Sequence, residues 1–262
     1  MEAIEARLGR SVFDLSGQLA VVTGVRRGLG LAIAEALASS GADIVGVSRH
    51  LELDGGEARA RVEALGRQFW GIAADLSDRG SVGQLLSRIA DLERSVDILV
   101  NNAGIIYREP AATHAIDEWD RVIEVNLTSQ FVLTQALGKQ MVSRGYGKVI
   151  FTASMLSFQG GVNVPSYTAS KHGVAGLTKA LANEWAATGV NVNAIAPGYI
   201  ATDNTQALRE DPIRSAAILE RIPAGRWGEA SDIAWTAVFL ASRASDYVNG
   251  AVVPVDGGWL GR

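Results

Sequence analysis

The chain has no cysteine and only three histidines. The absence of cysteine excludes disulfide bonds, thiolate catalysis and cysteine-bound metals. Neither His50 nor His114 has a second histidine or a carboxylate at the spacing of metal ligands, so we expect no metal site. His172 directly follows Lys171, and consecutive residues of a helix point about 100° apart. We therefore expect His172 to serve packing or an interface.

Long apolar runs and an excess of positive charge are also absent. No stretch approaches the 18 or so consecutive apolar residues of a membrane-spanning helix. The first residues, MEAIEARLGRSVFDLSG, lack the apolar segment of a signal peptide. The formal net charge of −4 gives no indication of nucleic acid or an anionic membrane as partner. We expect a cytoplasmic protein that binds neither.

Short apolar segments alternate with longer helical patterns along the 262 residues. This alternation is typical of βαβ units and predicts an α/β fold with a parallel sheet. The expected strands are 19–23, 43–48, 68–74, 96–101, 148–153, 190–196 and 251–255. They are apolar on both faces, as in a sheet covered by helices on both sides. No repeat or linker divides the chain, so we predict one domain over residues 1–262.

Two segments depart from this alternation. Residues 1–14 are expected to form an N-terminal arm or helix outside the core. Residues 197–226 are rich in proline and glycine. Such a segment suits a mobile lid over a cleft, and its alternative is a surface loop with a short helix.

A glycine-rich loop follows the first expected strand and opens the first helix. It reads TGVRRGLG, with the spacing G-x-x-x-G-x-G. Glycines allow a tight turn and a close backbone approach to a pyrophosphate, which then lies at the helix N-terminus. We predict a nucleotide site here. Its expected contacts are Gly24, Arg26, Arg27, Gly28, Leu29 and Gly30.

The end of the second strand bears on the choice between NADP and NAD. NAD enzymes often have an acidic residue there for the ribose hydroxyls. This chain has Ser48, Arg49 and His50 instead, and Arg27 lies on the same side. Arginine binds phosphate through a planar fork, so Arg27 and Arg49 favour NADP(H). If both are surface charges, NAD(H) remains possible.

Asp75 follows the third strand in AADLSD and precedes a helix. It is placed to accept a hydrogen bond from the adenine amino group, beside Leu76. It could equally cap the helix, as aspartate often does. Both roles stay open.

Three further residues suggest redox chemistry. Tyr167 and Lys171 lie four residues apart in PSYTASK, on one helix face, and Ser154 lies thirteen residues upstream of the tyrosine. A nearby ammonium stabilises a phenolate, whose ordinary pKa is about 10. Lowering that pKa by about three units takes roughly 4 kcal/mol, which a lysine and a cationic nicotinamide ring together could supply. Ser154 can then hold the substrate oxygen while Tyr167 moves the proton.

Taken together, these motifs resemble the short-chain dehydrogenase/reductase family from about Leu15 to the end. The matching segments are TGVRRGLG, AADL, NNAG at 101–104, VIEVNLTS with Asn126, Ser154, YTASK and PGYIAT at 197–202. The resemblance implies a Rossmann-like, doubly wound parallel sheet of seven strands, and usually a homotetramer.

The resemblance also implies roles for single residues. Lys171 would bond the nicotinamide ribose, and Asn126 would kink its helix and hold a water or the lysine in a proton relay. The adenosine side of the cofactor would be flanked by Asn102, Ala103 and Gly104. The nicotinamide carboxamide would be held by Pro197, Gly198, Ile200 and Thr202.

A narrower resemblance concerns the second half, including SMLSFQGGVNVPSYTASK and ERIPAGRWG. It is similar to the 2-deoxy-D-gluconate 3-dehydrogenase group, also described as 2-dehydro-3-deoxy-D-gluconate 5-dehydrogenases, and less closely to gluconate 5-dehydrogenases. Members of this group are generally regarded as NAD enzymes, whereas Arg27 and Arg49 favour NADP(H). We expect an oxidoreductase that interconverts a secondary alcohol and a ketone on a sugar acid. The rival functions are a 3-oxoacyl thioester reductase and a non-catalytic dinucleotide-binding regulator.

A sugar acid needs a cation and several hydrogen-bonding groups. Arg108 is the candidate for its carboxylate, unless it is a solvated loop residue. The candidates for its hydroxyls are Gln159, Asn163 and Tyr199, with Ser154 and Tyr167 at the reacting oxygen and Met155 and Trp227 as walls. Near the C-terminus, Trp259 and Leu260 are expected in a subunit interface or in the core of the chain itself.

Overall fold

The computed structural model describes residues 11–262. Most of the predicted N-terminal arm, residues 1–10, therefore lies outside the described residues. The core begins at Leu15, which is fully buried beneath α2 (Gly28–Ser39). No helix of residues 11–262 is long and apolar enough to cross a membrane.

Seven parallel strands form one sheet in the order β3-β2-β1-β4-β5-β6-β7. Their bounds are β1 Leu19–Thr23, β2 Asp43–Ser48, β3 Phe69–Ala73, β4 Ile98–Asn101, β5 Gly147–Thr152, β6 Val190–Pro197 and β7 Val252–Val255. Val21 of β1 pairs with Val45 on one side and Leu99 on the other, and all three side chains are fully buried. The predicted doubly wound, seven-stranded sheet is confirmed.

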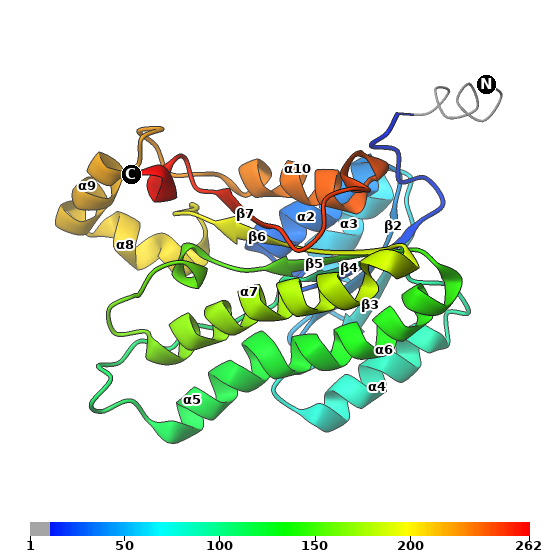
Figure 1. Ribbon diagram of the computed structural model, residues 1–262, viewed down its shortest axis with the longest axis horizontal. Helices are drawn as coiled ribbons and strands as arrows, with labels where there is room; N and C mark the ends of the chain where they lie inside the picture. Colours follow the sequence, from blue (N-terminus) through cyan, green and yellow to red (C-terminus); the bar gives the residue numbers. More distant parts are fainter. Residues whose placement is uncertain (1–10) are drawn as a thin grey trace.

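Helices cover both faces of the sheet (Figure 1). One face carries α2, α3 (Gly56–Ala64) and α10 (Ala230–Ala241), which share one apolar core. The other carries α4 (Arg79–Ala90), α6 (Ser129–Arg144) and α7 (Pro165–Trp185), which share a second core. The chain changes direction between β1 and β4, because β3 lies at the sheet edge and β4 returns beside β1. In such sheets ligands bind outside the carboxyl ends of the strands at this switch point.

The helix that leads into α6 contains an irregular turn. Helix α5 (Ile116–Ile123) continues into η1, a π-helical turn over Glu124–Thr128, and then into α6. Asn126 lies in this turn and is fully buried. Single π-helical turns are rare within α-helices and occur frequently at functional sites.

The expected lid segment forms short helices, η4 (Asp203–Thr205), α8 (Gln206–Glu210) and α9 (Pro212–Arg221). Together with the C-terminal turn η6 (Trp259–Gly261), they enclose a small third apolar cluster. In it Trp259 is only 5% exposed, and the Arg221 guanidinium lies 4.0 Å from the centre of its ring. Figure 1 shows the C-terminus beside α9. Of the two expectations for Trp259, burial in the core of its own chain is therefore the one observed.

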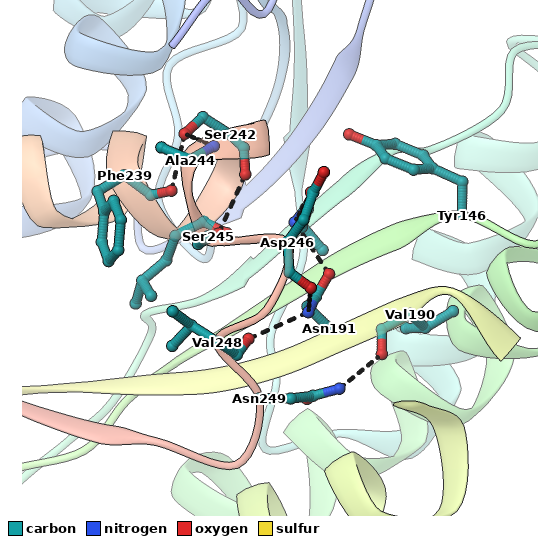
Figure 2. A network of polar contacts seen from close by, with 12 residues as sticks. Tyr146, Val190, Asn191, Phe239, Ser242, Ala244, Ser245, Asp246, Val248 and Asn249 are labelled. Atoms are coloured by element: carbon teal, nitrogen blue, oxygen red, sulfur yellow. Dashed lines mark hydrogen bonds and ion pairs between the residues drawn. The ribbon is translucent and has the colours of Figure 1, made fainter. Parts of the chain in front are cut away.

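A polar network ties the loop after α10 to β6 at the opposite end of the sheet (Figure 2). The Asn191 amide donates to the carbonyls of Asp246 and Val248, at 3.1 and 3.0 Å. Beside it, the buried Lys148 ammonium donates to Asn191 Oδ1 at 2.9 Å and to Asp246 Oδ1 at 2.8 Å. This end of the sheet is thus held by a closed set of polar contacts.

Candidate active site

A pocket of about 440 Å³, called the main pocket below, opens at the carboxyl ends of β1 to β5. It lies at the switch point of the sheet, where a ligand site is expected. Most of the predicted site residues line it, namely Gly24, Arg26, Arg27, Gly28, Leu29, Gly30, Ser48, Arg49, Asp75, Leu76, Asn102, Ala103, Gly104, Arg108, Tyr167, Lys171 and Thr202. The predicted residues outside its wall are Asn126, Ser154, Met155, Gln159, Asn163, Pro197, Gly198, Tyr199, Ile200 and Trp227.

The glycine-rich loop forms a tight backbone cradle at the start of α2. Gly24 has a φ of +75°, which L side chains rarely adopt. A Cβ atom at Gly30 would lie 2.1 Å from the Gly24 carbonyl oxygen, so only glycine fits there. The Thr23 hydroxyl accepts hydrogen bonds from the backbone N–H groups of Asn102 and Ala103, both at 3.0 Å. No side chain of residues 11–262 caps the N-terminus of α2, so its first N–H groups are available to an anion.

Asp75 occupies a corner of the main pocket with Arg49. Its Oδ1 accepts from the backbone N–H and the hydroxyl of Ser77, at 2.9 and 2.7 Å, and its Oδ2 lies 3.8 Å from Arg49. Burial raises the pKa of Asp75, but the Ser77 hydrogen bonds and the charges of Arg49 and Arg121 outweigh it, leaving the pKa below its ordinary value. Helix α4 is capped by Asp78, whose side chain accepts from the Gly80 N–H. The capping role considered for Asp75 is therefore wrong.

The two arginines of the glycine-rich loop point to different partners. Arg27 forms an ion pair with Asp203 at 2.9 Å, which joins the loop to the start of the lid segment. Arg26 forms an ion pair with Glu52, also at 2.9 Å, and its backbone N–H donates to the Ser48 hydroxyl. Arg27 thus turns toward the lid in this structure, and the backbone of Arg26 lies beside Ser48.

Tyr167 and Lys171 occupy successive turns of α7 on the pocket wall. Lys171 is 2% exposed, and its ammonium donates to the Thr152 carbonyl at 2.6 Å and lies 5.5 Å from the centre of the Tyr167 ring. Ser154 follows β5 and caps η2 (Met155–Ser157), its hydroxyl accepting from the Leu156 N–H at 3.1 Å. The one-turn spacing predicted from the sequence is therefore realised beside the glycine cradle.

Ser157 joins Ser154 to α7, a connection that sequence reasoning missed. Its hydroxyl donates to the Lys171 carbonyl at 2.7 Å and accepts from the Ser154 N–H at 3.3 Å. Its place three residues after Ser154 is the spacing of a capping box, which was the available signal.

Burial dominates the ionisation of both groups on α7. It raises the pKa of Tyr167, while the Ser154 hydroxyl and the positive charge of Arg108 act in the opposite direction without cancelling it. It lowers the pKa of Lys171 from 10.5 to about 8. In the chain alone, Lys171 therefore does not hold the Tyr167 pKa below its ordinary value. The lowering considered from the sequence needs a further positive charge in the pocket.

Asn126 ties three segments together behind the pocket wall. Its amide exchanges two hydrogen bonds with the backbone of Ile105, at 2.8 and 2.9 Å, and donates to the Ser170 hydroxyl at 3.1 Å. Ser170 in turn donates to the Tyr167 carbonyl at 2.7 Å. Asn126 makes no direct contact with Lys171 among these bonds, so its direct effect is to fix the first turns of α7.

Of the residues expected around the substrate, some line the main pocket and others do not. Arg108 is exposed, lines the main pocket and has no ion-pair partner within residues 11–262. Tyr199 packs edge-on against Trp227 and Trp259, with ring centres 5.5 and 4.8 Å away, and Met155 belongs to the same lid cluster. These two side chains belong to the third apolar cluster and lie outside the pocket wall.

The remaining predicted residues lie near the pocket or apart from it. A Cβ atom at Gly198 would lie 2.5 Å from the Asp256 Cα, so glycine allows the ends of β6 and β7 to pack. Ile200 is buried and bridges to Gly228. His172 is exposed on α7, where its ring contacts only the Thr168 carbonyl among the described hydrogen bonds.

Arg121 is a pocket residue that sequence reasoning missed. It extends from α5 to the corner of the main pocket where its charge acts on Asp75, and its ion pair with Glu118 spans 3.5 Å. Val125, four residues later, lines the same pocket. That helical spacing was the available signal, but it requires knowing which helix face meets the pocket.

Comparison with known proteins agrees with this architecture. A family profile described as Enoyl-(Acyl carrier protein) reductase matches residues 24–260. The 2-dehydro-3-deoxy-D-gluconate 5-dehydrogenase of Pseudoalteromonas atlantica is 58% identical over 250 residues, covering 95% of this chain and 98% of that protein.

Two solved structures are similar over nearly the full length. One from Agrobacterium tumefaciens, provisionally named a 2-deoxy-D-gluconate 3-dehydrogenase and containing NADP, is 51% identical with a TM-score of 0.89, covering 97% of this chain and all of that one. The gluconate 5-dehydrogenase of Burkholderia cenocepacia, in complex with NADP and tartrate, is 37% identical with a TM-score of 0.90, covering 95% and 98%. The chain therefore belongs to the short-chain dehydrogenase/reductase family.

Proposed function

We propose that this chain is an NADP(H)-dependent oxidoreductase that interconverts a secondary alcohol and a ketone on a sugar acid. The substrate is of the 2-dehydro-3-deoxy-gluconate, 2-deoxy-gluconate or gluconate type. The observation that carries the proposal is that Tyr167 and Lys171 line the same pocket as the glycine cradle. The names of the relatives described above supply the substrate class.

The residues of the main pocket fit a dinucleotide with a 2′-phosphate. The pyrophosphate would lie at the uncapped N-terminus of α2, where the cradle around Gly24 and Gly30 leaves no room for side chains. Ser48 and Arg49 would hold the 2′-phosphate, since β2 ends without an acidic residue. Asp75, with Leu76, would meet the adenine, and Arg121 would add positive charge to that corner. Two related structures that contain NADP support this preference over NAD(H).

The nicotinamide end of the cofactor would lie toward α7 and the start of the lid. Lys171 would bond the nicotinamide ribose, as the family resemblance implies. Pro197, Gly198, Ile200 and Thr202 would hold the carboxamide, and of these Thr202 lines the pocket. Asn102, Ala103 and Gly104 would flank the adenosine side.

The reaction divides between the cofactor and the chain. Bound NADP(H) supplies hydride exchange with the substrate carbon. Tyr167 gives or takes the proton at the substrate oxygen, and Ser154 holds that oxygen by a hydrogen bond. Lys171 provides positive charge next to Tyr167, which favours the phenolate once the tyrosine has given up its proton. Asn126 holds the turn of α7 that carries Tyr167 through Ser170.

Arg108 is the proposed anchor for the substrate carboxylate. It lines the main pocket, its charge reaches Tyr167, and its guanidinium has no ion pair with any residue of the described part of the chain. A free guanidinium at this position suits bidentate binding of a carboxylate. Gln159 and Tyr199 remain candidates for contacts with the substrate hydroxyls. Tyr199 could make such a contact only if the lid segment moved.

The rival functions predict different ligands. A 3-oxoacyl thioester reductase needs a surface for its acyl carrier, and the similarity to named sugar-acid dehydrogenases argues against it. A non-catalytic regulator has no need for Ser154, Tyr167 and Lys171 together.

We also propose a cytoplasmic homotetramer, which the family resemblance supports. Sedimentation velocity would test the oligomeric state.

Titration of the protein with NADPH and NADH, followed by nicotinamide fluorescence, tests the cofactor. NADPH should bind at least ten times more tightly, a difference of about 1.4 kcal/mol. Oxidation of 2-dehydro-3-deoxy-D-gluconate with NADP⁺, and reduction of 5-ketogluconate and of a 3-oxoacyl thioester with NADPH, should then be measured. Tyr167→Phe should abolish turnover without changing NADPH affinity. Turnover of the thioester alone, or unchanged turnover in the variant, would contradict the proposal.

A further inference from the structure

We propose that His114 is a positioning residue for substrate recognition, because it fixes the loop that carries Arg108 against the helix that carries Tyr167. The inference rests on the proposed function, in which Arg108 binds the carboxylate and Tyr167 transfers the proton. The loop concerned, residues 102–115, connects β4 to α5 and is called the carboxylate loop below.

Within residues 11–262 His114 makes a single hydrogen bond, and that bond reaches the neighbour of the catalytic tyrosine. Its Nε2 lies 3.0 Å from the hydroxyl of Ser166, which is fully buried in the first turn of α7. Its Nδ1 is buried and has no hydrogen-bond partner in the described part of the chain. The ring therefore has one polar attachment, and it joins the end of the carboxylate loop to the residue before Tyr167.

Two aromatic rings pack against the imidazole. The Tyr107 ring meets it edge-on with centres 5.3 Å apart, and the Trp119 ring does so at 6.3 Å. Tyr107 is the residue before Arg108, and its hydroxyl donates to the Glu109 carboxylate at 2.9 Å. The position of His114 is thus transmitted to the backbone next to Arg108.

A second contact holds the other side of Arg108. The Glu109 N–H donates to the Asn163 carbonyl at 2.9 Å, and Asn163 lies just before α7 with a φ of +60°. Both neighbours of Arg108 are therefore attached, directly or through one ring, to the segment that begins α7. Arg108 itself is left free toward the pocket, so its distance to Tyr167 depends on these two attachments.

This distance matters for a substrate with two fixed ends. A sugar acid must place its carboxylate at Arg108 and its reacting carbon beside Tyr167 and Ser154. Small displacements of a positioned substrate lower the rate strongly, because the reacting atoms leave the productive geometry. A neutral sugar has no carboxylate to place, so it should be insensitive to the carboxylate loop.

The test compares His114→Phe, which keeps an aromatic ring and loses the hydrogen bond, with His114→Gln, whose amide nitrogen can replace Nε2. The readout is kcat/KM for ketone reduction of the sugar acid and of a neutral ketose of equal length, with NADPH affinity and thermal stability as controls. His114→Phe should lower kcat/KM for the acid by roughly fivefold to tenfold, the effect of one hydrogen bond. The value for the neutral ketose and the NADPH affinity should stay within about twofold of wild type. His114→Gln should recover part of the loss, because it restores the hydrogen bond to Ser166 but not the ring contacts with Tyr107 and Trp119.

Several results would overturn the inference. Equal losses for both substrates, no loss for either, or no recovery with glutamine would show that His114 serves packing alone. Ser166→Ala removes the same hydrogen bond from the other side and replaces His114→Phe if that variant does not fold. Arg108→Gln separates the two proposals. If it removes the preference for the acid while His114→Phe does not, only the role of His114 fails; if it leaves the preference intact, the carboxylate anchor and the inference built on it both fail.

Discussion

Replacement of Lys171 by methionine should stabilise the fold while it abolishes turnover. Lys171 is 2% exposed and forms no ion pair with a carboxylate of residues 11–262, and burial lowers its pKa from 10.5 to about 8. That difference corresponds to about 3 kcal/mol of cost for the charged form at neutral pH. Methionine has a similar length and no charge to bury. Loss of the hydrogen bond to the Thr152 carbonyl costs ~1–2 kcal/mol of stability. The free energy of unfolding should therefore rise by about 1–2 kcal/mol.

The stability difference between the wild type and Lys171→Met should depend on pH. In the unfolded chain the lysine keeps its proton up to about pH 10.4, whereas in the folded chain it loses it near pH 8. Between these values the unfolded state binds more protons, so the wild-type protein gains stability as the pH rises. Methionine does not titrate. The advantage of Lys171→Met should therefore be largest at or below pH 7 and shrink by ~2 kcal/mol on going to pH 9.5.

Urea denaturation followed by tryptophan fluorescence, at one protein concentration and at both pH values, measures this difference. Lys148→Met is the matched control, since Lys148 is also buried but donates to Asn191 and Asp246. Its removal leaves the Asn191 Oδ1 without this donor and should cost ~1–3 kcal/mol. A Lys171→Met protein that is less stable at pH 7, or a difference that does not change with pH, would refute the reasoning.

Three further outcomes are expected. Gly30→Ala should weaken NADPH binding by at least ~100-fold while the circular dichroism spectrum stays unchanged. The reason is that the alanine Cβ would lie 2.1 Å from the Gly24 carbonyl oxygen and force the cradle open. An affinity within threefold of wild type would contradict this account of the cradle. Asp203→Asn breaks the ion pair with Arg27 and should raise the NADPH dissociation rate ~2- to 5-fold in stopped-flow fluorescence. High salt should raise this rate in the wild type but not in the variant, because salt screens the ion pair. The control Glu210→Gln, in the same segment, should leave the rate unchanged. In the reductive direction kcat/KM should fall as the pH rises through about 8, because Lys171 then loses the proton that supports the tyrosine; a flat profile from pH 7 to 9.5 would argue against that role.

The positions of short apolar runs in the sequence determined which segments form the strands of the sheet. A buried parallel strand must be apolar on both faces, so each of the seven strands is visible as a short apolar run. The first two, 19–23 and 43–48, agree with the structure to the residue, and 96–101 is longer than β4 because Val96 and Asp97 precede the ladder. Strand ends depend on where the neighbouring strand begins, which a single run does not contain.

Local spacing likewise placed the residues that act within one turn or one loop. The interval between Tyr167 and Lys171, and the glycines around Arg27, have consequences that follow from helix geometry and from the lack of a side chain. These features remain local, so their arrangement could be inferred before any tertiary contact was known.

Tertiary structure alone decided which partner each charged or polar side chain takes. Arg27 pairs with Asp203, 176 residues away, and Asn126 bonds the backbone of Ile105 instead of Lys171. His114, read from the sequence only as a non-ligand, becomes the link between the carboxylate loop and α7. The physical reason is that each of these groups binds a partner of opposite charge or matching hydrogen-bonding capacity, and many distant residues offer the same chemistry. Only the packing of the sheet and its helices brings one of them within reach.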